Sequence, residues 1–418
     1  MKYLIKKNNK SYIFCLFAAR ENLEDIVNIY RFFISNFLNT YNQFTIYNFK
    51  KTNKKNRDNI YKLFKNKNLK IIYIENNDDF LQQIEGKNLF AIDALDKNFQ
   101  NFRNRMIINK KNVYLIFIMN IGPISNTKTD KKTKLNYKNY FFLFLDNFKK
   151  KFFRLLILLN IFPKTLFYFD SRIRIIEKFN KNSFRKLILQ FPFLNFLINY
   201  YNIKKINSNS FESYKVSKSK IHNKNIIFID GNFKHQDILL REGANVIGNK
   251  KKYFFALKSY FGFIENILKK KIEIILHPSS KLSDYEDYFS SFKISKGNTD
   301  QKIYNSSLVI FHESSSIIDA IISKKKIISF ETELLGNYIK SRINFYKNEL
   351  GISSINIDKP VETIKLNKKK FIKLIATQNK KLKRYKKENL VSDNDNLPSH
   401  KVVLEVKNFI KKLENEKK

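Results

Sequence analysis

Two clusters of histidine and serine are the residues of this sequence best suited to chemistry. The first, His277-Pro278-Ser279-Ser280, follows the apolar run Ile272–Leu276, and the second, His312-Glu313-Ser314-Ser315-Ser316, follows the apolar run 308–311. Hydroxyl and imidazole groups donate hydrogen bonds to phosphate oxygens, and a protonated imidazole assists the departure of a phosphate leaving group. The residue types therefore indicate a ligand that carries phosphate. A histidine that only bonds a neighbouring carbonyl is the alternative for His277.

The elements around these clusters give both of them the same kind of position. An apolar run of about five residues is typical of a buried strand, and the apolar segment 317–322 is typical of a helix. Pro278 disfavours helical geometry at His277, which keeps that residue in an extended loop. Both clusters then lie at carboxyl ends of strands, where open α/β sheets bind ligands and helix N-termini favour anions.

The helix that begins near Ser316 has two interpretations. Ser316-Ile317-Ile318-Asp319 is a variant capping box, in which Ser316 accepts from the Asp319 N–H and the Asp319 side chain reaches back. Capping accounts for one serine, so we expect another serine of 314–316 to contact phosphate. Asp319 is alternatively placed to reach a ribose hydroxyl, a common role of acidic residues near bound nucleotides.

Acidic residues follow three further strand-like runs. Asp230-Gly231-Asn232 follows 226–229, Glu331 follows 327–330, and Asp170 follows 165–169. An Asp-Gly pair is more often a turn than a site, so none of these is specific by itself. The sequence contains no Walker A loop, no Gly-x-Gly-x-x-Gly, no Gly-x-Ser-x-Gly and no zinc-ligand spacing. This disfavours P-loop, dinucleotide, serine-hydrolase and zinc chemistry.

The order of elements predicts an α/β protein with two domains. Strand-like runs alternate with helix-like segments, such as 22–37 in the first half and 254–268 in the second. The strand-like runs of the first half are 13–18, 44–49, 71–75, 89–92, 113–119 and 165–169. Those of the second half are 226–229, 272–276, 308–311 and 327–330. A chain of 418 residues exceeds the roughly 250–300 at which one core usually splits. We expect a first domain at 1–206, a linker at 207–222, a ligand-binding domain at 223–360 and a basic helical tail at 361–418.

The net charge of +43, from 80 Lys and Arg against 37 Asp and Glu, is compatible with nucleic acid or an anionic membrane surface as a partner. The abundance of Lys, Asn, Ile, Phe and Tyr beside Trp 0 is the pattern of an AT-rich genome, so we expect codon usage to be the main source of the charge. Helices are expected at 367–387 and 402–413. For the first of these, packing against the domains is favoured over lipid binding, because its apolar face is thin.

Several features bear on location. The basic residues 1–10 precede only a short apolar run, which disfavours a secretory leader. The most apolar region, 141–169, is interrupted by charges and falls short of the roughly 20 apolar residues of a spanning helix. Cys15, the one cysteine, cannot form an internal disulfide. We expect a cytoplasmic protein, peripheral on the inner membrane.

Two segments within 226–335 carry a resemblance to a known family. IEIILHPSS and SSLVIFHESSSIIDAIISKKKIISFE resemble the nucleotide-sugar-binding domain of GT-B glycosyltransferases of bacterial surface polysaccharide, capsule and lipopolysaccharide synthesis. They look like the His-Pro and Ser-rich motifs of bacterial sialyltransferases and polysialyltransferases. The resemblance implies that His277 contacts and protonates the donor phosphate and that Ser314, Ser315 or Ser316 binds it. It also implies a CMP-linked sugar such as sialic acid as donor, with no metal and no cofactor.

The base motif of that group is matched in part. The group carries two acidic residues before a glycine, whereas this chain has the single acid Asp230 before Gly231, and Asp170 is a positional substitute without the glycine. We take His277, Asp230 and Asp170 as catalytic candidates. The candidates for binding the donor phosphate and nucleotide are Pro278, Ser279, Ser280, His312, Glu313, Ser314, Ser315, Ser316, Asp319, Gly231 and Asn232.

These features together predict an α/β protein of two Rossmann-like domains facing across a cleft, GT-B-like, with C-terminal helices. The predicted reaction moves a sugar from a nucleotide-activated donor to a surface glycan or lipid-linked acceptor. A UDP-sugar GT-B enzyme and a CDP-glycerol glycerophosphotransferase-like enzyme are the alternatives among enzymes. A basic nucleic-acid-binding protein is the alternative outside enzymes, and nucleic acid is the less favoured partner.

Overall fold

The computed structural model describes residues 11–65, 68–95, 102–110, 112–118, 165–171, 200–217, 225–231, 250–277, 280–364, 368–375, 380–391 and 396–415. These residues form two compact units. The first unit contains the described residues up to 118, those from 165 to 208, and those from 396 to 415; the second contains those from 209 to 391. Among the described residues, the chain passes from the first unit to the second after residue 208 and returns to the first at its C-terminal helix.

The first unit is built on a parallel sheet with the order β3-β2-β1-β4-β5-β6-β7. Its strands are β1 (Ser11–Ala18), β2 (Phe44–Asn48), β3 (Leu69–Tyr73), β4 (Lys87–Asp93), β5 (Val113–Ile118), β6 (Thr165–Asp170) and β7 (Tyr200–Lys205). Its described helices are α1 (Leu23–Tyr41), α2 (Lys54–Phe64), α3 (Asn77–Ile84), α4 (Phe102–Ile107) and α17 (Pro398–Asn415). The strand order reverses between β1 and β4.

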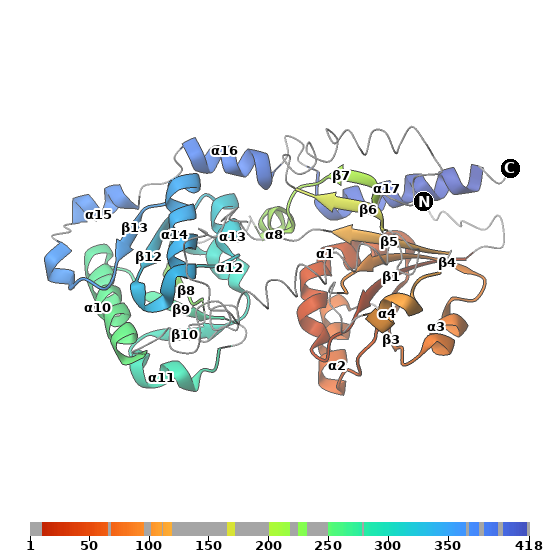
Figure 1. Cartoon of the computed structure of the whole chain (residues 1–418), viewed down its shortest axis with the longest axis horizontal. Helices are drawn as coiled ribbons and strands as arrows, with labels where there is room; N and C mark the ends of the chain where they lie inside the picture. The colour runs from red at the N-terminus through yellow and green to blue at the C-terminus, as the bar shows by residue number, and fades with distance from the viewer. Residues whose placement is uncertain are drawn as a thin grey trace, which may run out of the picture. The chain divides into compact units, whose positions relative to one another are not determined.

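The C-terminal helix α17 is part of the core of the first unit. Its buried residues Val402, Val406 and Ile410 belong to the same apolar cluster as α1. Phe409 on α17 meets Tyr114 of β5 and Phe167 of β6 edge to face. Figure 1 shows α17, in blue, beside the yellow strand β6 although the two are far apart in sequence. Burial of one apolar face explains why these residues form a helix.

The second unit is built on a parallel sheet with the order β10-β9-β8-β11-β12-β13. Its strands are β8 (Asn225–Ile229), β9 (Ile272–Leu276), β10 (Lys293–Lys296), β11 (Ser306–Phe311), β12 (Lys326–Glu331) and β13 (Ser354–Asn356). Its described helices are α8 (Asn209–Ser217), α10 (Lys250–Leu268), α11 (Ser283–Phe289), α12 (Thr299–Tyr304), α13 (Ile317–Ile322), α14 (Gly336–Leu350), α15 (Lys368–Leu374) and α16 (Lys380–Asn389), with 3₁₀ turns η4 (Glu333–Leu335) and η5 (Val361–Ile364). Here the order reverses between β8 and β11.

Successive side chains along the central strands of the second unit point to opposite faces of the sheet and so belong to two apolar layers. On β11, Leu308 and Ile310 pack with α10 on one face of the sheet, while Val309 and Phe311 pack with α13 and α8 on the other. Strands buried on both faces have nearly continuous apolar sequences, as parallel sheets covered by helices require. The predicted α/β class with two Rossmann-like domains and C-terminal helices is thereby confirmed.

Parts of the expected linker and tail pack into the second unit. Residues 209–217, expected within the linker, form α8, because Phe211 and Tyr214 give it an apolar side. Phe371 of α15 and Leu382 of α16 join apolar clusters of the same unit. The interpretation of the segment 367–387 as a packing element is confirmed for these side chains.

Expectations about the most apolar region are tested only in part. Residues 141–164 lie outside the described residues. Among the described helices, none combines the length and the apolar character needed to cross a membrane. Cys15 is fully buried in β1, and burial raises the pKa of its thiol well above the usual value.

Candidate functional site

The carboxyl edge of the second sheet brings the two predicted clusters together. β8 is the centre of the arrangement, with β9 paired on one side and β11 on the other. His277 follows β9, Asp230 and Gly231 follow β8, and residues 312–316 follow β11. Because neighbouring strands lie about 4.8 Å apart, the ends of β9 and β11 are separated by about 10 Å. The point where the strand order reverses is also where open α/β sheets hold ligands.

Asp230 holds the loop after β9 in place. Its carboxylate oxygen Oδ2 accepts hydrogen bonds from the Ser280 hydroxyl at 2.9 Å and from the Tyr285 hydroxyl at 2.8 Å, with the His277 N–H at 3.5 Å. Asp230 is 3% exposed. Burial and the nearby Asp230 charge raise the pKa of Tyr285, so this phenol stays protonated and donates. The geometry therefore gives Asp230 a positioning role toward the His277 loop.

Gly231 allows the loops after β8 and β11 to come very close. A Cβ atom at Gly231 would lie 3.2 Å from the Glu313 carbonyl oxygen, closer than nine in ten real Cβ contacts. Any side chain at this position would therefore push the two loops apart by a few tenths of an ångström. A glycine where backbones meet beside a ligand edge is consistent with a site that needs close packing of its loops.

His277 and the serines are the accessible members of the clusters. His277 is half-buried, and its carbonyl accepts the Ser280 N–H at 2.9 Å, which closes a tight turn. Ser315 is exposed, and Ser314 is half-buried with its hydroxyl oxygen 3.2 Å from the Ser316 N–H that it accepts. A hydroxyl that accepts one bond keeps its proton to donate. Pro278, Ser279 and Asn232, also predicted here, lie outside the described residues.

The predicted capping box at Ser316 is wrong. Ser316 has helical dihedral angles, φ −68° and ψ −6°, and its side chain makes no capping hydrogen bond. An N-cap residue normally has extended dihedrals, which point its oxygen toward the free N–H groups. The Asp319 carboxylate instead accepts the Tyr304 hydroxyl at 3.0 Å, and Asp319 is 8% exposed. Asp319 is therefore a largely buried residue held by Tyr304, and its contact with a ribose hydroxyl stays a prediction.

His312 is a buried neutral histidine in this structure, and its contact with the donor stays a prediction. It is 1% exposed, and its Nδ1 donates to the Phe330 carbonyl oxygen at 2.6 Å. Burial lowers the pKa of His312 to about 4. The ring lies among Phe228, Tyr253 and Phe330. Its Nε2 is buried without a hydrogen-bond partner.

Glu313 anchors the loop after β11 to a neighbouring helix. Its Oε1 lies 2.9 Å from Nη2 of Arg342 on α14, and both side chains are largely buried. A carboxylate paired in this way repels phosphate less than an unpaired one would. Glu313 therefore fixes the position of residues 312–316, called the serine loop.

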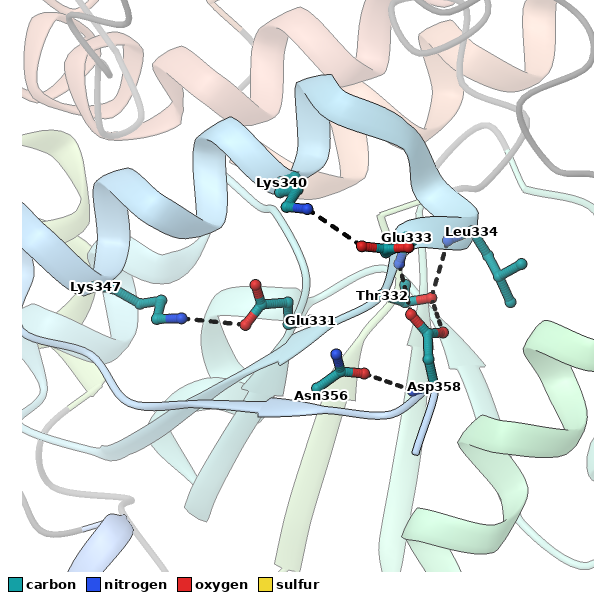
Figure 2. A network of polar contacts seen from close by, with 8 residues as sticks. All are labelled: Glu331, Thr332, Glu333, Leu334, Lys340, Lys347, Asn356 and Asp358. Atoms are coloured by element: carbon teal, nitrogen blue, oxygen red, sulfur yellow. Dashed lines mark hydrogen bonds and ion pairs between the residues drawn. The ribbon is translucent and has the colours of Figure 1, made fainter. Parts of the chain in front are cut away.

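A further polar network, which the sequence reasoning did not identify apart from Glu331, closes the ends of β12 and β13 (Figure 2). The Thr332 hydroxyl donates to Asp358 at 2.6 Å, and the Glu333 N–H donates to the same carboxylate at 2.8 Å. Thr332 also accepts the Leu334 N–H at 3.1 Å and so caps the 3₁₀ turn η4. Glu331 pairs with Lys347 of α14 at 3.2 Å. Threonine followed by glutamate before an apolar pair is a capping signal that could have located this turn.

The carboxyl edge of the first sheet is rich in buried polar contacts. Asp93, at the end of β4, forms an ion pair with Arg105 at 3.1 Å, and both side chains are buried. Asn48, at the end of β2, bonds the backbone of Arg20 through both its oxygen and its nitrogen. Asp170, predicted as a catalytic candidate, lies at the end of β6 and is 1% exposed. Among the described residues, no group of three or more His, Cys, Asp or Glu could hold a metal ion.

Comparisons with known proteins give matches at the level of structure. No protein-family model matches this chain, and no curated protein matches it by sequence. A variant of the wall teichoic acid polymerase TagF soaked with CDPG superposes with a TM-score of 0.53 at 12% identity, covering 97% of this chain and 90% of that one. A protein from Listeria monocytogenes assigned as a UDP-N-acetylglucosamine 2-epimerase gives 0.50 at 8% identity, covering 96% and 97%.

Similarity at these identities shows the fold. The sheet orders of both units and the match over nearly the whole chain assign this protein to the α/β proteins with two Rossmann-like domains of the GT-B type. Function has to be argued from the residues at the carboxyl edges, because one fold hosts many activities.

Proposed function

We propose that this protein is a glycosyltransferase-type enzyme that uses a nucleotide-activated donor and binds the donor phosphate at the carboxyl edge of β9, β8 and β11. The observation that carries the proposal is the placement of His277 and the serine loop on either side of Gly231. A separation of about 10 Å between the outer strands leaves room for a phosphate with one hydrogen bond on each side. The GT-B type of fold supports the same conclusion by analogy.

The roles proposed for the residues follow from their accessibility. His277 donates a hydrogen bond to the donor phosphate and, when protonated, gives its proton to the departing phosphate oxygen as the bond from that oxygen to the sugar carbon breaks. The acceptor hydroxyl forms the new bond to that carbon and loses its proton to a base. Ser314, Ser315 or Ser316 holds the same phosphate, and Asp230 keeps the His277 loop in place.

We propose Asp170, in the first unit, as the first candidate for the base. It closes a strand at the carboxyl edge of the first sheet, where a group acting on an acceptor would be expected. It is 1% exposed, so its action requires that bound acceptor reach the end of β6. An Asp170→Asn variant that retains donor hydrolysis but loses transfer to the acceptor would support this role.

For the donor we propose a cytidine nucleotide linked to a sugar, with CMP-sialic acid as the first compound to test. The ligand CDPG of the similar TagF structure and the UDP-N-acetylglucosamine of the similar epimerase define the other two donors to compare. The acceptor is proposed to be a surface glycan or a lipid-linked glycan.

Thermal shift with nucleotides is the first experiment. CMP, CDP, UDP and a short duplex DNA are each titrated against the whole chain, since a ligand at about 100 times its Kd stabilises the folded state by about 2.7 kcal/mol. Ser315→Ala and His277→Ala should reduce the shift, while Ser291→Ala, an exposed serine elsewhere in the second unit, should not. If no nucleotide shifts the transition, or if only DNA does, the proposed function is wrong.

A further inference from the structure

Phe255 is exposed on the surface of α10 without a packing role. Its side chain is 72% exposed, the highest value among the exposed large hydrophobic residues that the structure describes, whereas its neighbour Phe254 is fully buried. Helix α10 already has a complete apolar face, made by Phe254, Leu257, Phe261 and Ile264. Folding of the second unit therefore gives no reason for a phenylalanine at this position.

The residues around Phe255 on the helix surface are lysines. Each residue advances about 100° around an α-helix, so Lys251, Lys252 and Lys258 all lie within about 60° of Phe255. All three are exposed, and no acidic residue of α10 falls in this sector. Lys250 lies about 140° from Phe255 around the helix, outside this sector, and pairs with Asp284 of α11 at 3.5 Å.

Helix α15 packs against α10 near one edge of this sector. Phe371 of α15 meets Phe263 of α10 edge to face at 6.5 Å, which brings α15 against the C-terminal half of α10. On α15, Ile372 is 41% exposed. The exposed residues Phe255, Ile372, Lys251, Lys252, Lys258, Lys368, Lys369, Lys370 and Lys373 are called the α10–α15 face.

The positions of the lysines are unfavourable for the helices themselves. Both α10 and α15 begin with three consecutive lysines and have no acid in the first turn. The N-terminus of a helix carries partial positive charge, so lysine there lowers helix stability. Two adjacent helices with the same unfavourable start, next to exposed apolar side chains, indicate a partner that supplies negative charge and an apolar layer.

We propose that the α10–α15 face docks on an anionic phospholipid bilayer. Phe255 and Ile372 enter the boundary between headgroups and acyl chains, while the seven lysines contact anionic headgroups, the division of roles seen in interfacial helices. Helix α16, also rich in lysine, is a weaker candidate, because Leu382 packs in the core and Lys386 donates to the Ile322 carbonyl oxygen at 2.8 Å. The proposal does not depend on the proposed transfer reaction.

Tryptophan fluorescence gives a direct test, since the chain contains no tryptophan. Phe255→Trp introduces a single indole on the α10–α15 face, and Leu404→Trp introduces one at an exposed position of α17, where the leucine is 55% exposed. With vesicles of phosphatidylcholine and phosphatidylglycerol, we expect a blue shift and quenching by brominated acyl chains for Phe255→Trp only. Equal spectra with and without vesicles for Phe255→Trp would overturn the proposal.

Vesicle sedimentation separates this face from the charge of the whole chain. We expect Phe255→Ala to lower the partition coefficient at least tenfold, the lower end expected for losing a buried phenylalanine. Lys251→Glu with Lys258→Glu should lower it by more than that, whereas Lys407→Glu with Lys411→Glu, the same charge change on exposed positions of α17, should not. Equal losses of vesicle partitioning in the two lysine pairs would mean that binding follows the charge of the whole chain. Unchanged vesicle binding but weakened DNA binding in the variants of the α10–α15 face would mean that this face binds nucleic acid. Either result refutes the proposal. Circular dichroism melts of each full-length variant confirm that it is folded.

Discussion

The hydrogen bond between Tyr285 and Asp230 predicts an energetic coupling that can be measured. Tyr285→Phe removes a 2.8 Å bond to a carboxylate that is 3% exposed, and Asp230→Asn removes the charge from the same bond. Hydrogen bonds to charged groups contribute about 1.5–3 kcal/mol each. Each single variant should therefore lower the stability of the second unit by about 2 kcal/mol. The double variant should cost about 1–2 kcal/mol less than the sum, because both remove one interaction.

Hydrogen exchange of the amides of β8 and β9 is the suitable assay, since it reports opening of the second unit alone in a chain with two units. Tyr288→Phe is the matched control, because Tyr288 lies on the same helix α11 as Tyr285 but is half-buried. Additive effects of Asp230→Asn and Tyr285→Phe, or an equal loss in Tyr288→Phe, would refute the positioning role of Asp230.

Three further predictions concern the same edge. His277→Ala should reduce transfer by roughly a hundred- to ten-thousand-fold while changing the melting temperature little, as expected for an acid catalyst on a loop; parallel loss of melting temperature and activity would mark a structural histidine. Gly231→Ala should reduce the nucleotide-induced rise in melting temperature by a larger fraction than it lowers the melting temperature of the free protein. The reason is that the new methyl group meets the Glu313 carbonyl oxygen and separates the two loops. The pKa of His312 is lowered to about 4 in the folded state, so the unfolded chain binds the extra proton first and stability should fall as pH drops from about 6.5 toward 4. Denaturation at a series of pH values should show a flatter profile for His312→Phe, and identical profiles would contradict the assignment of a neutral buried imidazole.

The strands with apolar sequences could be predicted from the sequence, and the polar edge strands could not. Runs 226–229, 272–276, 308–311 and 327–330 all lie within observed strands of the second sheet. β10, with the sequence KISK, and β13, with SIN, lie at the two edges of that sheet and contain too little apolar surface to be recognised. Their pairing depends on neighbours that are distant in sequence, which local patterns do not encode.

The position of His312 was predictable in principle. Successive side chains on a strand point to opposite faces, so His312 continues the face of Leu308 and Ile310, which packs under α10. Its place beside three serines suggested a shared function, but the alternation sends His312 into the core and leaves Ser315 exposed. The role of Asp230 was not predictable, because its partner Tyr285 is 55 residues away.

The return of the chain to the first unit has a consequence for how the protein folds during synthesis. Asn36 on α1 donates to the hydroxyl of Ser399 on α17 at 3.1 Å, across 363 positions of sequence. The described residues of the second unit, 209–391, thus lie between two parts of the first in sequence, and they can fold as soon as they have left the ribosome. The first unit, although it begins earlier in the chain, keeps an uncovered apolar surface on α1 and β6 until residues near 410 emerge. The part that is made first is therefore expected to be completed last, and in the interval its exposed surface is the one that chaperones would bind.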